Sequence, residues 1–428
     1  MSMLDDNTDT LTLQEELTCL HCWSRCSPDE VLWISEHQEL LGDPLLGESA
    51  QRRFLPARFT LTGEALDPRG QICREIACPH CHLPLPRAML EHPPLLVSII
   101  GTPTCGKSYY LGALTWSLRR MLPKLFGVEF VDVDPAANRL LHIYEEKLFL
   151  SQTPDQLTAL GALIDKTPVY GGGLLSEVNF GQQKVQYAKP FSFVVQPTER
   201  HPRAEQRSRL ARVCCLYDNA GEHFLPGNDT LSNQSTRHLA MSSLLLFLYD
   251  PTQDPRLNDV LRRANPDRHP PATKHAGRQE TVLREVAQRI RTQLSLGREA
   301  KVDRPLFVAV TKADLWASVL GEFWSEEPWT PIGEKGLHAI DIPSILRMSE
   351  KTRLLLERFV PEIVAAAQSL STQVYFLPVS ATGVRPEWDS EGQGCVRPKD
   401  LAPVWVSVPF AHALSHTVSG LLPRLKST

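Results

Sequence analysis

The sequence predicts an α/β fold with a mainly parallel six-stranded sheet, helices on both of its faces and several insertions, preceded by a small domain marked by cysteines. Six near-continuous apolar runs alternate with segments of helical periodicity, a pattern typical of buried parallel strands joined by crossover helices. Six of the 10 cysteines lie within the first 92 residues, in a short-patterned stretch. We therefore expect an acidic flexible tail over 1–17, a small domain over 18–92 and the α/β domain over 93–428.

The composition suits a soluble protein with a large core. Hydrophobic residues make up 42% of the 428 positions and charged residues 22%, with a formal net charge of −4. No apolar run approaches the roughly 20 residues that a membrane-spanning helix needs. The acidic start, MSMLDDNTDT, lacks the apolar core of a secretory signal. We expect a cytoplasmic protein with no membrane span.

Two C-x-x-C pairs in the small domain predict a structural zinc site. In a chain without an export signal the thiols stay reduced, so clustered cysteines indicate metal ligands rather than disulfides. Two pairs supply the four thiolates of a tetrahedral zinc site, so we expect a zinc-ribbon-like domain. The predicted ligands are Cys19, Cys22, Cys78 and Cys81.

Other residues of this domain leave alternatives open for the zinc site. Cys26 and Cys73 are spare thiols that could replace a ligand. The histidines His21, His80 and His82 could do the same, although we expect ordinary surface positions for them.

The small domain is strongly acidic. Residues 1–92 hold seven Arg and no Lys against 15 Asp and Glu, a net charge of −8, and four thiolates around one Zn²⁺ would add two negative charges. Nucleic-acid binding requires Lys and Arg to neutralise phosphates. We therefore expect this domain to dock a protein partner and not a nucleic acid.

The first apolar run leads into a phosphate-binding motif. Gly101-Thr-Pro-Thr-Cys-Gly106-Lys107-Ser108 matches G-x4-G-K-[ST] and precedes a helical pattern. The glycines let backbone N–H groups curl around a phosphate, and the helix adds its positive N-terminus. Lys107 is expected to reach the β- and γ-phosphates, with Ser108 as a Mg²⁺ ligand. The expected nucleotide contacts here are Gly101, Thr104, Cys105, Gly106, Lys107, Ser108 and Tyr109.

Three shorter motifs follow in chain order, each at the carboxyl end of a predicted strand, where open α/β sheets bind ligands. Asp218-Asn-Ala-Gly221 is a D-x-x-G, and Thr311-Lys312-Ala313-Asp314 is close to N-K-x-D. Ser380-Ala381 lies at the end of the last predicted strand. The predicted strands are 95–100, 190–195, 212–218, 243–250, 305–311 and 373–380.

Through these four motifs, across residues 95–382, the chain resembles the Ras-like P-loop GTPases of the translation-factor-related class. The resemblance implies that Asp218 holds Mg²⁺ through water and that the N–H of Gly221 senses the γ-phosphate of GTP. It thereby implies GTP and GDP as ligands and Mg²⁺ as a cofactor.

The same resemblance implies how the base is chosen. Asp314 would accept hydrogen bonds from the N1 and N2 donors of guanine, and the stem of Lys312 would cover the base. The N–H of Ala381, beside Ser380, would contact guanine O6. Thr311 replaces the usual Asn, as it does in Rho-type members. Adenine lacks the donor pair that Asp314 needs, so GTP is expected over ATP.

Two departures from the family pattern concern hydrolysis. Glu222 follows the D-x-x-G motif, where Ras-like enzymes have a Gln that orients the attacking water. A carboxylate can act as a base, but it repels the γ-phosphate, so we expect slow intrinsic hydrolysis that a partner's positive charge accelerates. The alternative is that Glu222 lies on the surface and that another residue positions the attacking water. His223 is the nearest candidate in the sequence. The second departure is the interval between Lys107 and Asp218, which is far longer than a minimal small GTPase needs. Within it, Thr167 is our candidate for the Mg²⁺-binding threonine of the first switch.

Together with the cysteine domain, these features resemble the double-GTPase family of bacterial conflict systems. The resemblance covers CPHCHLPLP from Cys78 to Pro86, the Asp250-Pro251 turn and the segment VRPKDLAPVWVSVPF. It implies a regulatory switch whose protein partners include a second GTPase and an adaptor or activating protein. Two other functions stay open: a nucleotide-binding scaffold with negligible hydrolysis, and a translation or ribosome-associated GTPase, which the acidic domain disfavours.

Overall fold

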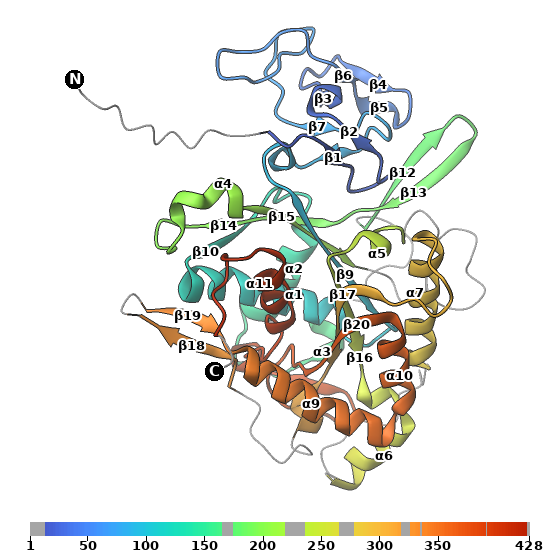
Figure 1. Cartoon of the computed structure of the whole chain (residues 1–428), viewed down its shortest axis with the longest axis vertical. Coiled ribbons are helices and arrows are strands. Elements are labelled where there is room, and N and C mark those ends of the chain that lie inside the picture. The colour runs from blue at the N-terminus through green and yellow to red at the C-terminus, as the bar shows by residue number, and fades with distance from the viewer. Residues whose placement is uncertain are drawn as a thin grey trace.

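A mixed β-sheet of seven described strands forms the centre of the molecule (Figure 1). The computed structural model describes residues 13–164, 174–218, 236–264, 278–317, 326–333, 336–390 and 392–425. The strand order is β10-β14-β15-β9-β16-β17-β20. Their bounds are β9 (Pro94–Gly101), β10 (Val128–Asp132), β14 (Phe191–Pro197), β15 (Arg212–Asp218), β16 (Leu244–Tyr249), β17 (Val302–Val310) and β20 (Ser371–Pro378).

All six predicted strands occur in this sheet, and the five from β15 to β20 run parallel to one another. The expected total of six strands is wrong, because β10 adds a seventh at one edge. β14 and β10 continue the sheet in antiparallel order. As an edge strand β10 needs only one buried face, and Val131 on it is 43% exposed. It therefore lacks the continuous apolar run by which the other strands are found.

Helices cover both faces of the sheet, because the strand side chains alternate between two cores. In β16, Leu244, Leu246 and Leu248 point into one core, and Leu245, Phe247 and Tyr249 into the other. Helices α1 (Lys107–Met121), α2 (Arg139–Phe149) and α11 (Val408–Thr417) pack in the first core (Figure 1). The second core holds α6 (Pro255–Ala264), α7 (Gln279–Gln293) and α10 (Pro361–Leu370), while α9 (Ile342–Phe359) reaches both.

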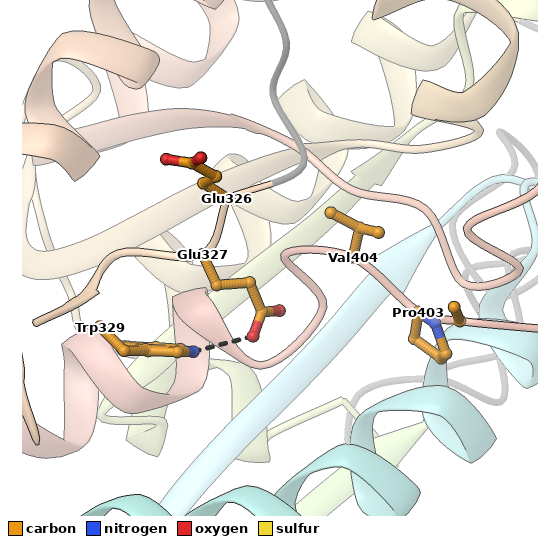
Figure 2. A pocket seen from close by; sticks show the side chains of 6 residues that line it. Glu326, Glu327, Trp329, Pro403 and Val404 are labelled. Atoms are coloured by element: carbon orange, nitrogen blue, oxygen red, sulfur yellow. Dashed lines mark hydrogen bonds between the residues drawn. The ribbon is translucent and has the colours of Figure 1, made fainter. Parts of the chain in front are cut away.

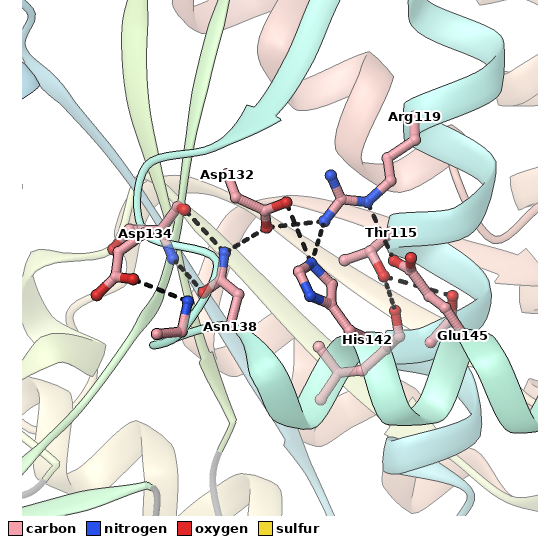
Figure 3. Close-up of polar contacts among 11 residues, drawn as sticks. Thr115, Arg119, Asp132, Asp134, Asn138, His142 and Glu145 are labelled. Atoms are coloured by element: carbon pink, nitrogen blue, oxygen red, sulfur yellow. Dashed lines mark hydrogen bonds and ion pairs between the residues drawn. The ribbon is translucent and has the colours of Figure 1, made fainter.

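Polar contacts fix the second half of α1 to β10 and α2 (Figure 3). Arg119 donates to Asp132 Oδ1 from Nη2 at 2.8 Å and to Glu145 Oε1 from Nε at 3.2 Å. Asn138 Nδ2 donates to Asp132 Oδ1 at 2.7 Å, and His142 Nε2 lies 3.1 Å from Asp132 Oδ2. Burial acts to raise the pKa of Asp132, but its hydrogen bonds with Arg119 and Asn138 lower it overall. These contacts set the direction of the helix that begins at Lys107.

Residues 13–92 form a module of short strands, which we call the cysteine module. Its main sheet has the order β6-β3-β7-β8, beside the hairpins β1-β2 and β4-β5. Leu17, which the expected tail included, is buried in β1. The strands are β1 (Leu17–Thr18), β2 (Arg25–Cys26), β3 (Leu32–Ile34), β4 (Leu41–Asp43), β5 (Gly47–Gln51), β6 (Arg53–Phe54), β7 (Ile76–Ala77) and β8 (Pro84–Leu85).

The cysteine module packs against β15 and against a long hairpin, β12 (Leu175–Phe180) with β13 (Gln183–Ala188) (Figure 1). Val213 and Tyr217 of β15 and Val178 of β12 share one apolar cluster with the module's cysteines. The boundary predicted at residue 92 stays a prediction. Within the described residues, helices are too short or too polar to cross a lipid bilayer.

Candidate functional site

The predicted phosphate-binding loop joins β9 to α1. A Cβ on Gly101 would lie 2.6 Å from Cys105 Sγ and 3.0 Å from the carbonyl oxygen of Leu248, so only glycine fits there. Gly106 has φ +96°, in the left-handed region that favours glycine, and directly precedes the helix. The N–H groups of a helix's first turn lack acceptors within the helix, so the N-terminal end of α1 can bind an anion.

Lys107 lies folded over this loop. Its Nζ donates to the carbonyl oxygens of Gly101 at 3.0 Å and Thr102 at 2.9 Å. The ammonium group is therefore held against the loop that the motif predicts to bind phosphate. Two other expected contacts point elsewhere: the Cys105 side chain is fully buried, and the Tyr109 hydroxyl donates to the carbonyl of Leu160.

The D-x-x-G motif begins beside this loop. Asp218 is the last residue of β15 and pairs with Ile99 in the parallel ladder with β9. This register brings Asp218 to the sheet edge at which the loop starts. Gly221, Glu222 and Thr167 lie outside the described residues, as does His223.

The T-K-A-D segment also contacts the phosphate loop. It follows β17, and the Thr311 hydroxyl donates to the Cys105 carbonyl at 3.3 Å. Lys312 has φ +55°, and its Nζ donates to Asp250 Oδ2 at 2.6 Å and to the Thr252 hydroxyl at 3.1 Å. The structure thus brings together the phosphate loop and the T-K-A-D segment, whose contacting residues Cys105 and Thr311 are 206 positions apart in the chain.

Asp314 and Ser380 also lie together. The Ser380 hydroxyl donates to Asp314 Oδ1 and accepts from the Gly383 N–H at 2.8 Å. Burial raises the pKa of Asp314 to about 6, and the hydrogen bond from Ser380 opposes this shift. Ala381, partly buried, follows Ser380 directly. Two backbone hydrogen bonds with Val404, at 3.0 and 2.9 Å, hold Ser380 in place.

Next to this segment lies a cavity of about 580 Å³, lined by Glu326, Glu327, Trp329, Ala402, Pro403 and Val404 (Figure 2). Glu327 accepts hydrogen bonds from Trp329 Nε1 at 2.8 Å and from the backbone N–H of Trp405 at 3.0 Å. Burial raises the pKa of Glu327. The cavity borders the segment that contains Ser380, because its lining residues Ala402 and Val404 make backbone hydrogen bonds with Thr382 and Ser380.

Sequence reasoning missed a buried polar segment beside the loop, residues 250–253. The Asp250-Pro251 turn was visible in the sequence, but its contacts with Lys312 were not expected. The available signal was the polar run D-P-T-Q directly after an apolar central strand, at the carboxyl edge where ligands bind.

The four predicted zinc ligands form one buried cluster. Their sulfur atoms all lie within 4.8 Å of one another, and Cys19–Cys81 and Cys22–Cys78 are each 3.7 Å apart. A tetrahedron with Zn–S bonds of about 2.3 Å has S···S edges of about 3.8 Å, so the geometry fits zinc. Hydrogen bonds from the other thiols, Cys19 first, lower the pKa of Cys22, whereas hydrogen bonds with Cys22 and the other thiols raise the pKa of Cys19.

The alternative ligands lie apart from this cluster. Cys26 and Cys73 are buried separately, and burial raises the pKa of each thiol to about 11. The expectation that the histidines are exposed holds for His80 but is wrong for His21. The ring nitrogens of His21 lie 3.1 Å from the carbonyl oxygens of Ala188 and Pro84, because the ring fills the contact between the module and the hairpin.

The cysteine cluster connects to the strand that carries Asp218. The hydroxyl of Tyr217 donates to the Leu20 carbonyl, between two of the cysteines, at 2.7 Å. The ring of Trp23 lies 5.9 Å from that of Tyr217, which in turn stacks on His238 at 4.4 Å. The neighbour of a predicted Mg²⁺ ligand is therefore anchored on the cysteine module.

Comparisons with known proteins add little to this site. The sequence matches no family model and no curated protein. Among solved structures, the SRβ–SRX complex with GTP from Chaetomium thermophilum is 12% identical, with 70% of this chain and 96% of that chain covered and a TM-score of 0.25. The GTP-bound Ski7 GTPase-like domain of S. cerevisiae is 12% identical, with 79% and 52% covered and a TM-score of 0.27. A variant of Era from Aquifex aeolicus with GDP and aluminium fluoride is 12% identical, with 77% and 57% covered and a TM-score of 0.22. Likeness at these scores is too weak to indicate fold or function.

Proposed function

We propose that the chain is a GTP-binding and GTP-hydrolysing molecular switch. The observation that carries the proposal is the meeting of the phosphate loop with the T-K-A-D segment, through the hydrogen bond from Thr311 to the Cys105 carbonyl. A nucleotide needs a phosphate site and a base site at one sheet edge, and these two segments provide both. The hydrogen bond from Ser380 to Asp314 adds the segment after β20, the last parallel strand, to the proposed base site.

The base site selects guanine through Asp314. The Ser380 hydroxyl holds one carboxylate oxygen, which fixes the orientation of the group toward a ligand. At neutral pH Asp314 is mainly ionised and accepts the two donors of guanine, which adenine cannot offer. Lys312 and the N–H of Ala381 complete the contacts with the base.

The phosphate site combines Lys107 with oxygen ligands for Mg²⁺. Ser108 and Asp218 would hold the ion, since hydroxyl and carboxylate oxygens are the donors that Mg²⁺ prefers. The ion would supply positive charge to the β- and γ-phosphates. In this proposal Glu222 faces the attacking water, Gly221 senses the γ-phosphate and Thr167 belongs to the first switch. Hydrolysis by the chain alone is slow.

The cysteine module is proposed to hold one structural zinc and to dock a protein partner. Its four-thiol geometry and its net charge of −8 support this role over nucleic-acid binding. A cytoplasmic regulatory component of a bacterial conflict system, working with a second GTPase and an adaptor or activating protein, is the biological role that we propose.

Single-turnover hydrolysis of GTP and of ATP by the full chain with Mg²⁺ tests the proposal. We expect slow release of phosphate from GTP, loss of it in Lys107→Ala, and faster release in Glu222→Gln because the repulsion of the γ-phosphate is removed. Equal rates for GTP and ATP, or an unchanged rate in Lys107→Ala, would overturn it.

A further inference from the structure

The segment that follows β16 lies between the two halves of the proposed nucleotide site. It forms a short turn of 3₁₀ helix, Pro251–Gln253, and all three of its side chains are buried. Asp250, which caps this turn, accepts from Lys312, and Gln279 holds the Asp250 backbone through hydrogen bonds of 2.9 and 2.8 Å. The turn is therefore fixed from the side of the T-K-A-D segment.

At the other end of the turn, Gln253 is 3% exposed and makes three contacts with the phosphate loop. Its Nε2 donates to the Pro103 carbonyl and to the Thr104 hydroxyl, each at 3.2 Å. Its Oε1 accepts from the Thr102 hydroxyl at 3.1 Å. A carbonyl oxygen can only accept, so the Pro103 contact fixes which way the carboxamide faces.

The loop needs such support because of its backbone. Thr104 has φ +62°, a left-handed conformation that is uncommon for a β-branched residue and costs free energy. Strained residues keep such conformations only where surrounding contacts determine them. Gln253 contacts Thr104 and both residues before it, which are the loop positions just ahead of Cys105 and Gly106.

We propose that Gln253 is a positioning residue for phosphate binding. Its carboxamide holds residues 102–104 in the conformation that turns the loop's N–H groups toward the β-phosphate. The inference rests on the proposed nucleotide site. Gln253 itself acts through the loop, since its polar atoms are engaged by Thr102, Pro103 and Thr104.

The test compares GDP with GMP, because only GDP carries the β-phosphate that the loop would bind. Both are titrated calorimetrically with Mg²⁺ into the full chain and into Gln253→Met, which keeps side-chain length but removes all three hydrogen bonds. We expect GDP to bind about 10- to 100-fold more weakly to the variant, from the loss of hydrogen bonds worth about tenfold or less each. The affinity for GMP and the preference for GDP over ADP should stay unchanged.

Two further variants keep the test decisive. Thr102→Val removes only the hydroxyl that donates to Gln253 Oε1, so it should weaken GDP binding by a smaller factor and again spare GMP. Gln183→Met makes the same substitution at an exposed position on β13 and should leave both affinities unchanged.

The outcomes separate the inference from the function on which it rests. Unchanged GDP affinity in Gln253→Met, or in Thr102→Val should the first variant not fold, overturns the positioning role. Equal losses for GDP and GMP also overturn it, since they indicate general structural damage. Failure of the unmodified chain to bind GDP overturns the proposed function and this inference with it.

Discussion

The cysteine module and the seven-stranded sheet are stabilised in different ways. Strands of the module have two to five residues, and its interior is centred on four cysteines that are 0–9% exposed. Strands of the central sheet have five to nine residues and bury aliphatic side chains on both faces. The sheet is therefore stabilised mainly by apolar burial, and we expect the module to depend in addition on a zinc ion held by its four thiols.

The largest expected effect concerns the thiols. Cys19→Ser should abolish stoichiometric zinc and speed hydrogen exchange throughout residues 13–92, while amides of β9, β16 and β17 stay protected. Structural zinc supplies about 10–16 kcal/mol of apparent binding free energy to small domains, so loss of one ligand removes several kcal/mol. Elemental analysis and hydrogen exchange measure the two effects.

The matched control is Cys73→Ser, a buried cysteine of the same module outside the four-thiol cluster. It should retain one zinc per chain. Normal protection of the module in Cys19→Ser without zinc would contradict the difference drawn between the two regions.

The second prediction concerns the sheet's own site. Lys107→Ala should weaken GDP binding by about 10- to 100-fold, because a hydrogen bond from a charged group contributes about 1.5–3 kcal/mol. Zinc content should stay at one per chain, since Lys107 donates its hydrogen bonds to loop carbonyls and the four thiols lie in the cysteine module. Lys124→Ala, an exposed lysine shortly after α1, serves as the control in calorimetric titration. Equal GDP affinity in the two variants would show that the loop at Lys107 does not bind the phosphates.

The sequence predicted those parts of both regions that depend on local pattern. The parallel strands are buried on both faces, so each appears in the sequence as an apolar run. The four clustered cysteines appear through the fixed spacing of their two C-x-x-C pairs. β10 was missed because an edge strand needs only one apolar face. The burial of His21 was missed because it depends on a hairpin more than 150 residues away. Gln253 belongs to the polar run D-P-T-Q, but only the fold brings its side chain to the phosphate loop, about 150 residues earlier in the chain.

The third prediction uses the pH dependence of Asp314. Its raised pKa, about 6, leaves the carboxylate mainly ionised at pH 7.5 and protonated at pH 5. Since only the ionised form accepts both guanine donors, the preference for GDP over ADP should fall by about tenfold between these values.

Ser380→Ala sharpens this prediction. Removing the hydroxyl that lowers the pKa of Asp314 should move the midpoint of the selectivity loss to higher pH. A GDP-to-ADP ratio that stays constant from pH 7.5 to pH 5 would show that Asp314 does not choose the base.

The smallest expected effect tests the contact between the two regions. Tyr217→Phe removes the hydrogen bond to the Leu20 carbonyl and should lower the free energy of unfolding by about 1–2 kcal/mol, because a buried acceptor loses its partner. Urea denaturation followed by tryptophan fluorescence measures the change, with Tyr375→Phe, on β20, as the control. If the free energy of unfolding falls no further in Tyr217→Phe than in the control, this hydrogen bond does not stabilise the contact between the two regions.

We propose that the sheet edge at Lys107 and Asp314 binds guanine nucleotides. Competition of GDP and of ADP against a fluorescent GDP analogue on the full chain, with Mg²⁺ at pH 7.5, tests it most directly. We expect GDP to displace the analogue at concentrations at least 100-fold lower than ADP requires, because ADP would leave the buried carboxylate without the two donors of guanine. Displacement by both nucleotides at equal concentrations, or no binding of the analogue, would contradict it.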